Sequence, residues 1–129
     1  MNPYAAYSQQ ATTTASPAQL VLMLYDGALA RIEAAREALE AEPRDLEKVN
    51  TSLHKAQAIV RELQITLDHE RGGDIAANLA GLYTYAQGQL VEANVHKAVE
   101  PLDEATNVIR PLRDAWEASC VNSSVAVAG

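Results

Sequence analysis

Hydrophobic side chains in residues 45–67 recur every three or four positions without a miss, and this spacing leaves few folds open. The stripe consists of Leu46, Val49, Leu53, Ala56, Val60, Leu63 and Leu67. Residues at such spacing lie on one face of an α-helix. An apolar helical face is stabilised by packing against other elements, because each Å² removed from water contributes roughly 25 cal/mol.

Three other segments show the same period, so helices are predicted at about 17–41, 45–67, 74–96 and 101–119. Their expected core faces are Val21, Tyr25, Ala28, Ile32, Ala35 and Leu39; Ile75, Leu79, Leu82, Ala86 and Leu90; and Leu102, Ala105, Ile109, Leu112 and Trp116. Pro111 predicts a kink within the last helix, because its ring crowds the preceding turn. Short connections between helices favour antiparallel neighbours, so the sequence predicts an all-α, up-down four-helix bundle.

The first helix has a clear start signal. Ser16 is a good N-cap, Pro17 suits the first helical position, and Gln19 completes a capping box. Gly27 lies mid-helix, where glycine costs about 1 kcal/mol relative to alanine, so we expect another backbone to approach closely there. The residues expected to build the structural core are Ser16, Pro17, Tyr25, Gly27, Leu63, Leu79, Leu82 and Trp116.

Two terminal segments flank the bundle, which is expected to span residues 16–119. Residues 1–15 contain no Asp, Glu, Lys or Arg, but hold Tyr4 and Tyr7. This composition predicts a flexible arm. The arm is either simply disordered, or its tyrosines dock on an apolar groove, since aromatic rings bring large apolar area at low entropic cost. Residues 120–129 are predicted to form a disordered tail.

Bulk composition excludes several classes of partner. The formal net charge is −7 and no basic run exists, which argues against a nucleic-acid surface. No targeting segment is evident, and no apolar run approaches membrane-spanning length, so membrane insertion is not expected. The single cysteine, Cys120, excludes an internal disulfide framework and fits a reducing cytoplasm.

Catalytic and metal-binding patterns are absent from the sequence. Carboxylate-bridged metals in helical bundles use Glu-x-x-His pairs, but His54, His69 and His96 are preceded at that spacing by two threonines and an alanine. No phosphate-binding loop follows a strand, and no Ser or Cys has an evident His partner. We therefore expect no enzyme activity and no cofactor. Asp26 stands out within an apolar helix; we interpret it as the polar edge, the alternative being a supporting hydrogen-bond acceptor.

The chain carries more apolar residues than one central core needs. Leu22, Leu29, Ile59 and Ile65 lie off or beside the core stripes, and helix 74–96 adds tyrosines and an alanine-rich side. The surplus predicts a groove that accepts amphipathic helices from a partner. A larger core or the seam of a homodimer would account for the same residues.

Several motifs, in order, resemble those of the FliS family of flagellin-specific export chaperones. The first matching motif is Y-x-x-Y from Tyr4, and the second is S-P-A-Q-L-V-L-M-L-Y-D-G-A-L from Ser16. The matching motifs that follow are K-A-Q-A-I-V-R-E-L from residue 55, L-D from 67, G-G-D-I-A-A-N-L-A-G-L-Y-T-Y from 72, L-V-E-A-N from 90 and L-R-D-A-W from 112. Their order and spacing together are specific to that family.

The resemblance implies a non-catalytic, antiparallel four-helix bundle of the bacterial cytoplasm. Such a chaperone binds the disordered C-terminal region of flagellin, prevents its premature polymerisation and helps deliver it to the flagellar type III export gate. The client wraps around the bundle as helical segments, and the N-terminal arm covers part of its site. The residues expected to contact the client are Tyr4, Tyr7, Leu22, Leu29, Ile59, Ile65, Tyr83 and Tyr85.

Overall fold

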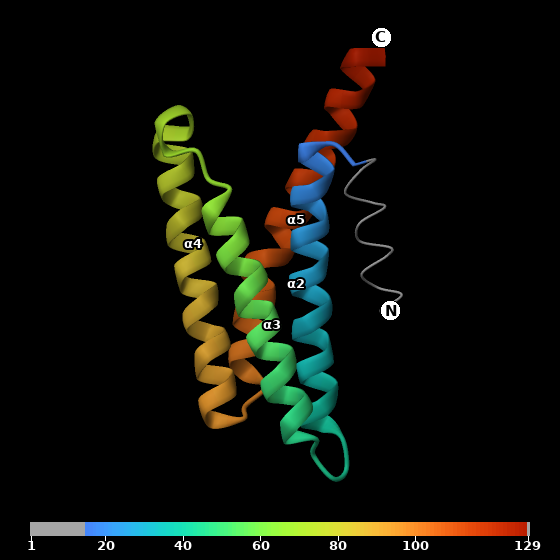
Figure 1. The fold of residues 1–129 in the computed structure, drawn as a ribbon, viewed down its shortest axis with the longest axis vertical. Helices are drawn as coiled ribbons and strands as arrows, with labels where there is room; N and C mark the ends of the chain where they lie inside the picture. The colour runs from blue at the N-terminus through green and yellow to red at the C-terminus, as the bar shows by residue number, and fades with distance from the viewer. Residues whose placement is uncertain (1–14, 129) are drawn as a thin grey trace, which may run out of the picture.

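The computed structural model describes residues 15–128, and the side chains of residues 15–120, as four helices without a strand. In chain order they are α2 (Pro17–Glu40), α3 (Leu46–Ile65), α4 (His69–His96) and α5 (Glu100–Ala128) (Figure 1). The all-α four-helix fold predicted from the hydrophobic periodicity is therefore confirmed. Tyr4 and Tyr7, with the arm that contains them, lie outside the described residues.

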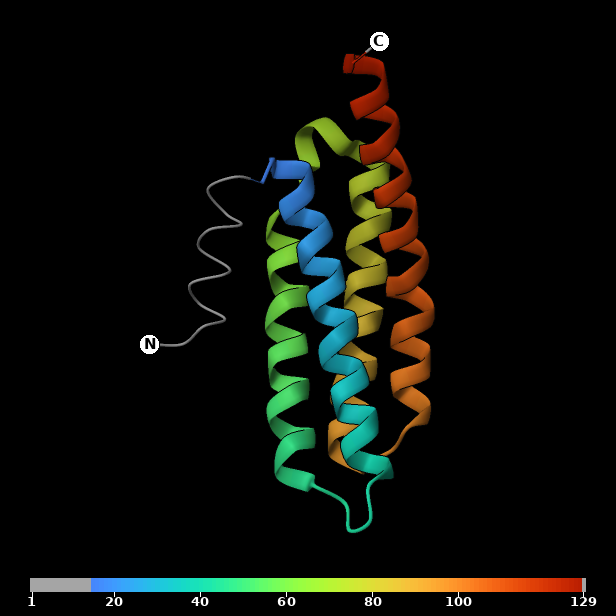
Figure 2. The ribbon, with the colours of Figure 1, turned by 90° about the vertical axis from the view of Figure 1, so that its right-hand side faces the viewer.

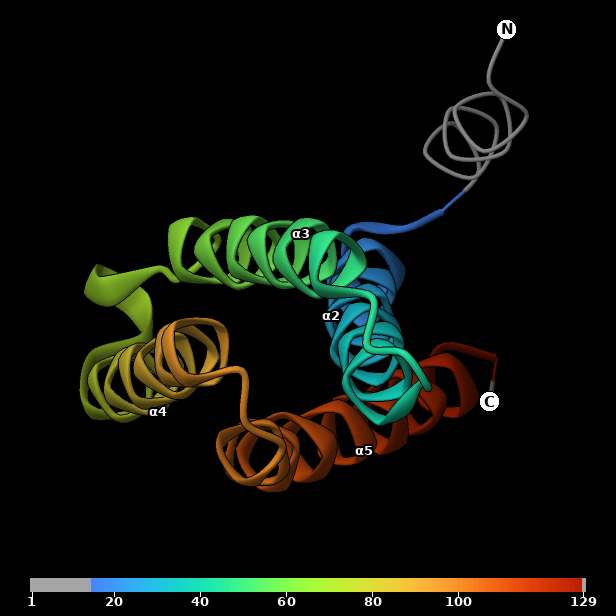
Figure 3. The same ribbon diagram turned by 90° about the horizontal axis from the view of Figure 1, so that it is seen from below.

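Consecutive helices run antiparallel because residues 41–45, 66–68 and 97–99 are too few to let the chain cross the bundle. Figure 2 shows the chain running down and up in turn. Viewed from one end, α2 packs against α3 and α5, and α4 also packs against α3 and α5 (Figure 3). Thus α2 and α4 occupy one diagonal of the bundle, and any contact between them crosses its centre.

The core is made almost entirely of the predicted apolar stripes. Its buried members are Tyr25, Ala28, Ile32, Ala35, Ala38, Leu39, Val49, Leu53, Ala56, Val60, Leu63, Tyr83, Ala86, Leu90, Ala93, Leu102, Ala105 and Ile109. Leu79 and Trp116 are partly buried against this cluster. Alternating steps of three and four keep these side chains on the inward faces of the helices, which explains why three of the four stripes largely match the prediction. Leu46 is an exception: it was expected in the core stripe but is 47% exposed in the first turn of α3.

In each of the first three helices, the side chain of the N-cap residue accepts a hydrogen bond from one backbone amide of the first turn. The predicted capping box is present: the Ser16 hydroxyl accepts from the Gln19 amide at 3.1 Å, and the Gln19 side chain accepts from the Ser16 amide at 2.9 Å. Asp45 caps α3 by accepting from the Lys48 amide at 3.0 Å. Pro17 follows the first cap without loss, because an N–H at that position has no partner inside the helix.

The third helix begins earlier than the predicted residue 74. Asp68 caps it by accepting from the Arg71 amide at 3.0 Å, so a first turn forms from His69 onward. Gly73 then breaks the helical geometry with φ 50° and ψ −123°. Glycine adopts this conformation readily because it has no Cβ. The expected glycine turn is therefore placed inside α4, between one short turn and the long helix.

The core face of α4 is also rotated from the predicted one. Ile75 and Leu82 were expected in the core, but they are 72% and 40% exposed. Ala76 and Tyr83, one position further along, are buried instead. The correct stripe is Ala76, Leu79, Tyr83, Ala86, Leu90 and Ala93. Side-chain size misled the prediction, because two alanines and a tyrosine with a satisfied hydroxyl take the buried positions while larger aliphatic residues face water.

Helix α5 extends beyond the predicted end at residue 119. It continues through Pro111, as expected, and also through the segment predicted as a disordered tail, to Ala128. The sequence from Cys120 to Ala128 contains no proline or glycine. Once a helix is nucleated, each added residue gains one backbone hydrogen bond, so such a segment extends it at little cost.

Candidate functional site

Large apolar side chains are exposed mainly on α4. Ile75 and Val95 are 72% and 68% exposed, and Leu82, Tyr85 and Val91 are 40–48% exposed. Steps of seven and three place Ile75, Leu82 and Tyr85 along one strip, and the step of four places Val91 and Val95 along another. Within residues 15–120, the other exposed large apolar side chains are Met23, Leu46 and Ile65. Helix α4 thus offers apolar area to a partner.

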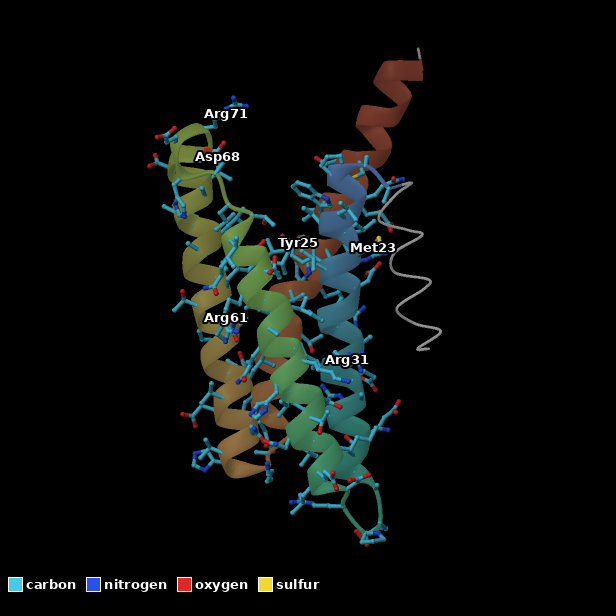
Figure 4. The ribbon with its side chains drawn as sticks, viewed as in Figure 1. Met23, Tyr25, Arg31, Arg61, Asp68 and Arg71 are labelled. Atoms are coloured by element: carbon cyan, nitrogen blue, oxygen red, sulfur yellow. The ribbon has the colours of Figure 1, made fainter. Side chains whose placement is uncertain are left out.

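A groove of about 420 Å³ lies between α2 and α3. Its lining is Gly27, Ala30 and Arg31 from α2, with Lys55, Ala58 and Ile59 from α3. Small or aliphatic residues form its floor, and both charged residues that border it are cations. Figure 4 labels Arg31 where α2 and α3 run side by side, and Arg61 further along α3. The groove has the apolar floor and polar border expected of a site for a helix.

Gly27 sets how closely the two helices approach at this groove. A Cβ atom placed on Gly27 would lie 3.3 Å from Cδ1 of Ile59. This is tighter than ordinary van der Waals contact, so the glycine lets Ile59 sit against the backbone of α2. Gly27 therefore has a close neighbour, but that neighbour is the Ile59 side chain of α3 and not the backbone that was predicted.

Replacing Gly27 by leucine should lower the free energy of unfolding by about 1–3 kcal/mol, because the added side chain overpacks against Ile59. Gly81 offers a matched control in α4, since a Cβ there would have no neighbour within 4 Å. Gly81→Ala should raise the free energy of unfolding by about 0.5–1 kcal/mol through its helix propensity alone. Urea unfolding of both variants measures the two effects, and equal stability of Gly27→Leu and the wild type would contradict this packing.

The predicted client-contact residues of the helices occupy different environments. Ile65 and Tyr85 are 68% and 45% exposed, whereas Leu22, Leu29 and Ile59 are only partly exposed. Leu29 and Ile59 also pack against the core. Ile59 lines the α2–α3 groove, so it alone of this set belongs to that groove. The predicted set is therefore distributed over several faces of the bundle.

Tyr83 was predicted to contact a partner, but the structure places it in the core. It is 2% exposed, and its hydroxyl lies 2.5 Å from that of Tyr25, which is 3% exposed. The bond joins α2 to α4 across the bundle diagonal. Burial raises the pKa of both hydroxyls, most strongly that of Tyr83, whose hydrogen bond to Tyr25 adds to the effect. A side chain held in this way is unavailable to a partner without opening the bundle.

Tyr85 lies near α5. Its hydroxyl donates to Oε2 of Glu104 at 3.1 Å, and this bond to the carboxylate raises the pKa of Tyr85. The ring itself remains accessible, because the residue is 45% exposed. Tyr85 therefore keeps the exposed aromatic surface that the sequence predicted, with its polar end fixed by a neighbouring helix.

Asp26 binds a cation of α5. Its Oδ1 accepts from Nε of Arg113 at 2.7 Å, and the same guanidinium contacts Glu117 at 2.6 Å and Asp114 at 3.2 Å. The bond to Asp26 is the main cause that raises the pKa of Arg113. Asp26 lies at the exposed edge of α2, as interpreted, and it is also a hydrogen-bond acceptor that joins α2 to α5, which was the alternative. A second pair, Arg36 with Asp103, joins the same two helices.

Among the described residues, no group of three or more His, Cys, Asp or Glu is placed to hold a metal ion. In the same part of the chain, no helix has the length and apolarity needed to cross a membrane. Every buried side-chain nitrogen or oxygen described has a hydrogen-bond partner. The polar groups of the described core are thus all hydrogen-bonded within the bundle. The groups available to a partner are the exposed apolar strips and the surface charges.

Sequence reasoning missed two features of the bundle, one at its surface and one in its core. The first is the pair of cations, Arg31 and Lys55, that border the groove; they lie on different helices, and no spacing rule links them. The second is the buried pair of Tyr25 and Tyr83. The signal for Tyr83 was present, because the alternating stripe from Ala76 to Ala93 places a tyrosine in the core, but large exposed neighbours obscured it.

An antiparallel four-helix bundle with exposed apolar strips and an apolar groove has the form of a helical protein-binding module. Comparison with solved structures supports the fold. A crystal structure described as a flagellar chaperone from bacteria shares the fold, with a TM-score of 0.74 and 22% identity, over 93% of this chain and 99% of that one.

Sequence comparison identifies the family. The family model described as "Flagellar protein FliS" matches residues 1–123. The flagellar secretion chaperone FliS of Bacillus subtilis strain 168 is 40% identical over 116 residues, covering 90% of this chain and 84% of the relative. That of Campylobacter jejuni is 37% identical over 123 residues, covering 95% and 94%. The chain belongs to the FliS family of flagellar secretion chaperones, as its motifs predicted.

Proposed function

We propose that this chain is a cytoplasmic export chaperone whose client is flagellin. It binds the disordered C-terminal region of flagellin, prevents premature polymerisation, and assists delivery to the flagellar type III export apparatus. It does so without catalysis or a cofactor, and its further partners are components of the export gate. Neither nucleic acid nor membrane insertion has a part in this function.

The apolar surface that the bundle leaves uncovered carries this proposal. The exposed strips of α4 and the α2–α3 groove lie on separate parts of the bundle, so one compact ligand cannot cover both. A disordered segment that folds on binding wraps large surfaces, because it orders only as it makes contact. Amphipathic helical segments joined by extended chain would place apolar stripes on each region in turn.

The decisive experiment is isothermal titration calorimetry of the full chain with the C-terminal segment of flagellin from the same bacterium. Coupled folding and binding predicts a favourable enthalpy, an unfavourable entropy and a negative heat-capacity change. The far-UV circular dichroism of the mixture should also show more helix than the sum of its parts. An internal flagellin segment of equal length is the control and should not bind.

An exposed α4 residue tests the location of the interface. Val95→Ser should weaken flagellin binding several-fold while leaving the fold intact, because Val95 is 68% exposed and contributes little to the core. His54→Ser, at an exposed position on α3, is the matched control. Absence of binding to the flagellin segment by the wild type would refute the proposed function itself.

A structural homodimer is the alternative function, because the same α4 strips would be covered by a second copy. Sedimentation velocity of the chain alone and with flagellin separates the two readings. A dimer that persists when flagellin is added, and no complex with flagellin, would support the homodimer. Dissociation of a dimer by flagellin would instead mean that both occupants use one surface.

A further inference from the structure

The two cations beside the α2–α3 groove have no ion pair with any residue whose side chain is described. Elsewhere in this part of the chain, Arg36, Arg71 and Arg113 each lie within 4 Å of a carboxylate. Arg31 and Lys55 form no such pair. Arg44, Lys48, Arg61 and Arg110 also form none. Arg31 and Lys55 differ from these four because they line the α2–α3 groove. An intramolecular ion pair therefore does not explain their position.

The groove between them fits a narrow apolar surface. Gly27, Ala30 and Ala58 present no side chain beyond Cβ, and Ile59 is the largest apolar residue of the lining. Small residues allow the backbone of a docked helix to approach closely, as they do at helix–helix contacts generally. Arg31 comes from α2 and Lys55 from α3, so the cations border the floor from both helices.

The two cations determine which charges are favourable on a helix that docks in the groove. An acidic side chain beside the apolar stripe of a docked helix would meet Arg31 or Lys55, and a basic one would meet like charge. Charges at the rim of an interface influence association rate and partner choice more than total affinity. The effect also falls as salt screens the exposed pair.

We propose that the α2–α3 groove selects an amphipathic helix that carries acidic residues on both edges of a narrow apolar stripe. The biological identity of this helix, a segment of the flagellin client, rests on the proposed function. The preference for acidic edges does not, because it follows from Arg31, Lys55 and the groove floor. The two cations are specificity-determining residues that discriminate among helices with similar apolar stripes.

Two synthetic helical peptides with identical apolar stripes test the preference directly, one with glutamate at its edges and the other with glutamine. The wild type should bind the glutamate peptide about fivefold more tightly in low salt, as two exposed ion pairs would give. The double variant Arg31→Gln/Lys55→Gln should bind both peptides equally. Arg110→Gln, an exposed cation of α5 outside the groove, should keep the preference.

Fluorescence anisotropy with labelled peptides measures these affinities over a series of salt concentrations. The inference would be overturned if the wild type showed no preference for the glutamate peptide. It would also be overturned if the double variant kept a preference as large as that of the wild type. Flagellin that binds the wild type and the double variant equally would overturn its application to the client, while leaving the proposed function intact. A glutamate preference without any binding of flagellin would support the groove inference and refute the proposed function.

Discussion

Trp116→Ala should lower the free energy of unfolding by about 3 kcal/mol, the lower end of the range for removing a large aromatic side chain from a core. The ring packs against the core but is not fully buried. Its Nε1 also donates to the carbonyl oxygen of Ala18 at 2.7 Å. Trp116 thereby fastens α5 to the beginning of α2, and its loss removes both apolar contact and the hydrogen bond.

Trp116→Phe separates these two contributions. Phenylalanine keeps most of the apolar contact and removes the donor, so it should cost only about 1 kcal/mol, the usual worth of one hydrogen bond. Urea unfolding must be followed by far-UV circular dichroism, because Trp116 is the only tryptophan of the chain. A loss below 1 kcal/mol in the alanine variant would show that the ring does not pack between α5 and α2.

Tyr83→Phe should lower the free energy of unfolding by about 1–3 kcal/mol, because it leaves the buried hydroxyl of Tyr25 without a partner. Tyr25→Phe should have a similar effect for the reciprocal reason. The double variant should be close to wild type, since it leaves no unpaired polar group in the core. This non-additivity is the signature of a direct contact, and a double-mutant cycle measures it.

The same pair should make stability fall in alkaline solution. Burial raises the pKa of Tyr25 and Tyr83 above the ordinary value of 10.0 in the folded chain. The neutral form is then favoured by folding, so the stabilisation is complete below pH 10 and is lost as the unfolded tyrosines ionise above it. Unfolding free energies measured from pH 8 upward should therefore decline more steeply in the wild type than in the double phenylalanine variant.

Comparing the wild type with the double phenylalanine variant separates the effect of Tyr25 and Tyr83 from other effects of alkaline pH. Tyr85 is present in both, so its own raised pKa cancels. Identical pH profiles, together with additive single substitutions, would show that the two hydroxyls do not share a buried hydrogen bond. The cross-diagonal contact between α2 and α4 would then have to be discarded.

The sequence by itself determined the helical class and most of the core. Steps of three and four place Leu53, Val60 and Leu63 on one face, and a helix that carries such a face has to bury it. Local signals also worked where local chemistry decides: Ser16 and Gln19 form the expected capping box, because its atoms all lie within one turn. The family followed from motifs whose order is a property of the sequence alone.

Only the tertiary structure decided which apolar residues remain exposed. Leu82 and Tyr83 are adjacent in the sequence, and either side chain is large and apolar enough for a core position. Which of them is buried depends on Tyr25, which is 58 positions away from Tyr83 along the chain. Burying Tyr83 satisfies two hydroxyls at once, whereas turning Leu82 inward would leave Tyr25 without its partner. Tertiary packing also decided the position of the two groove cations. Arg31 and Lys55 border one groove only because α2 and α3 pack side by side. The local periodicity of each helix carries no information about which helix lies next to it.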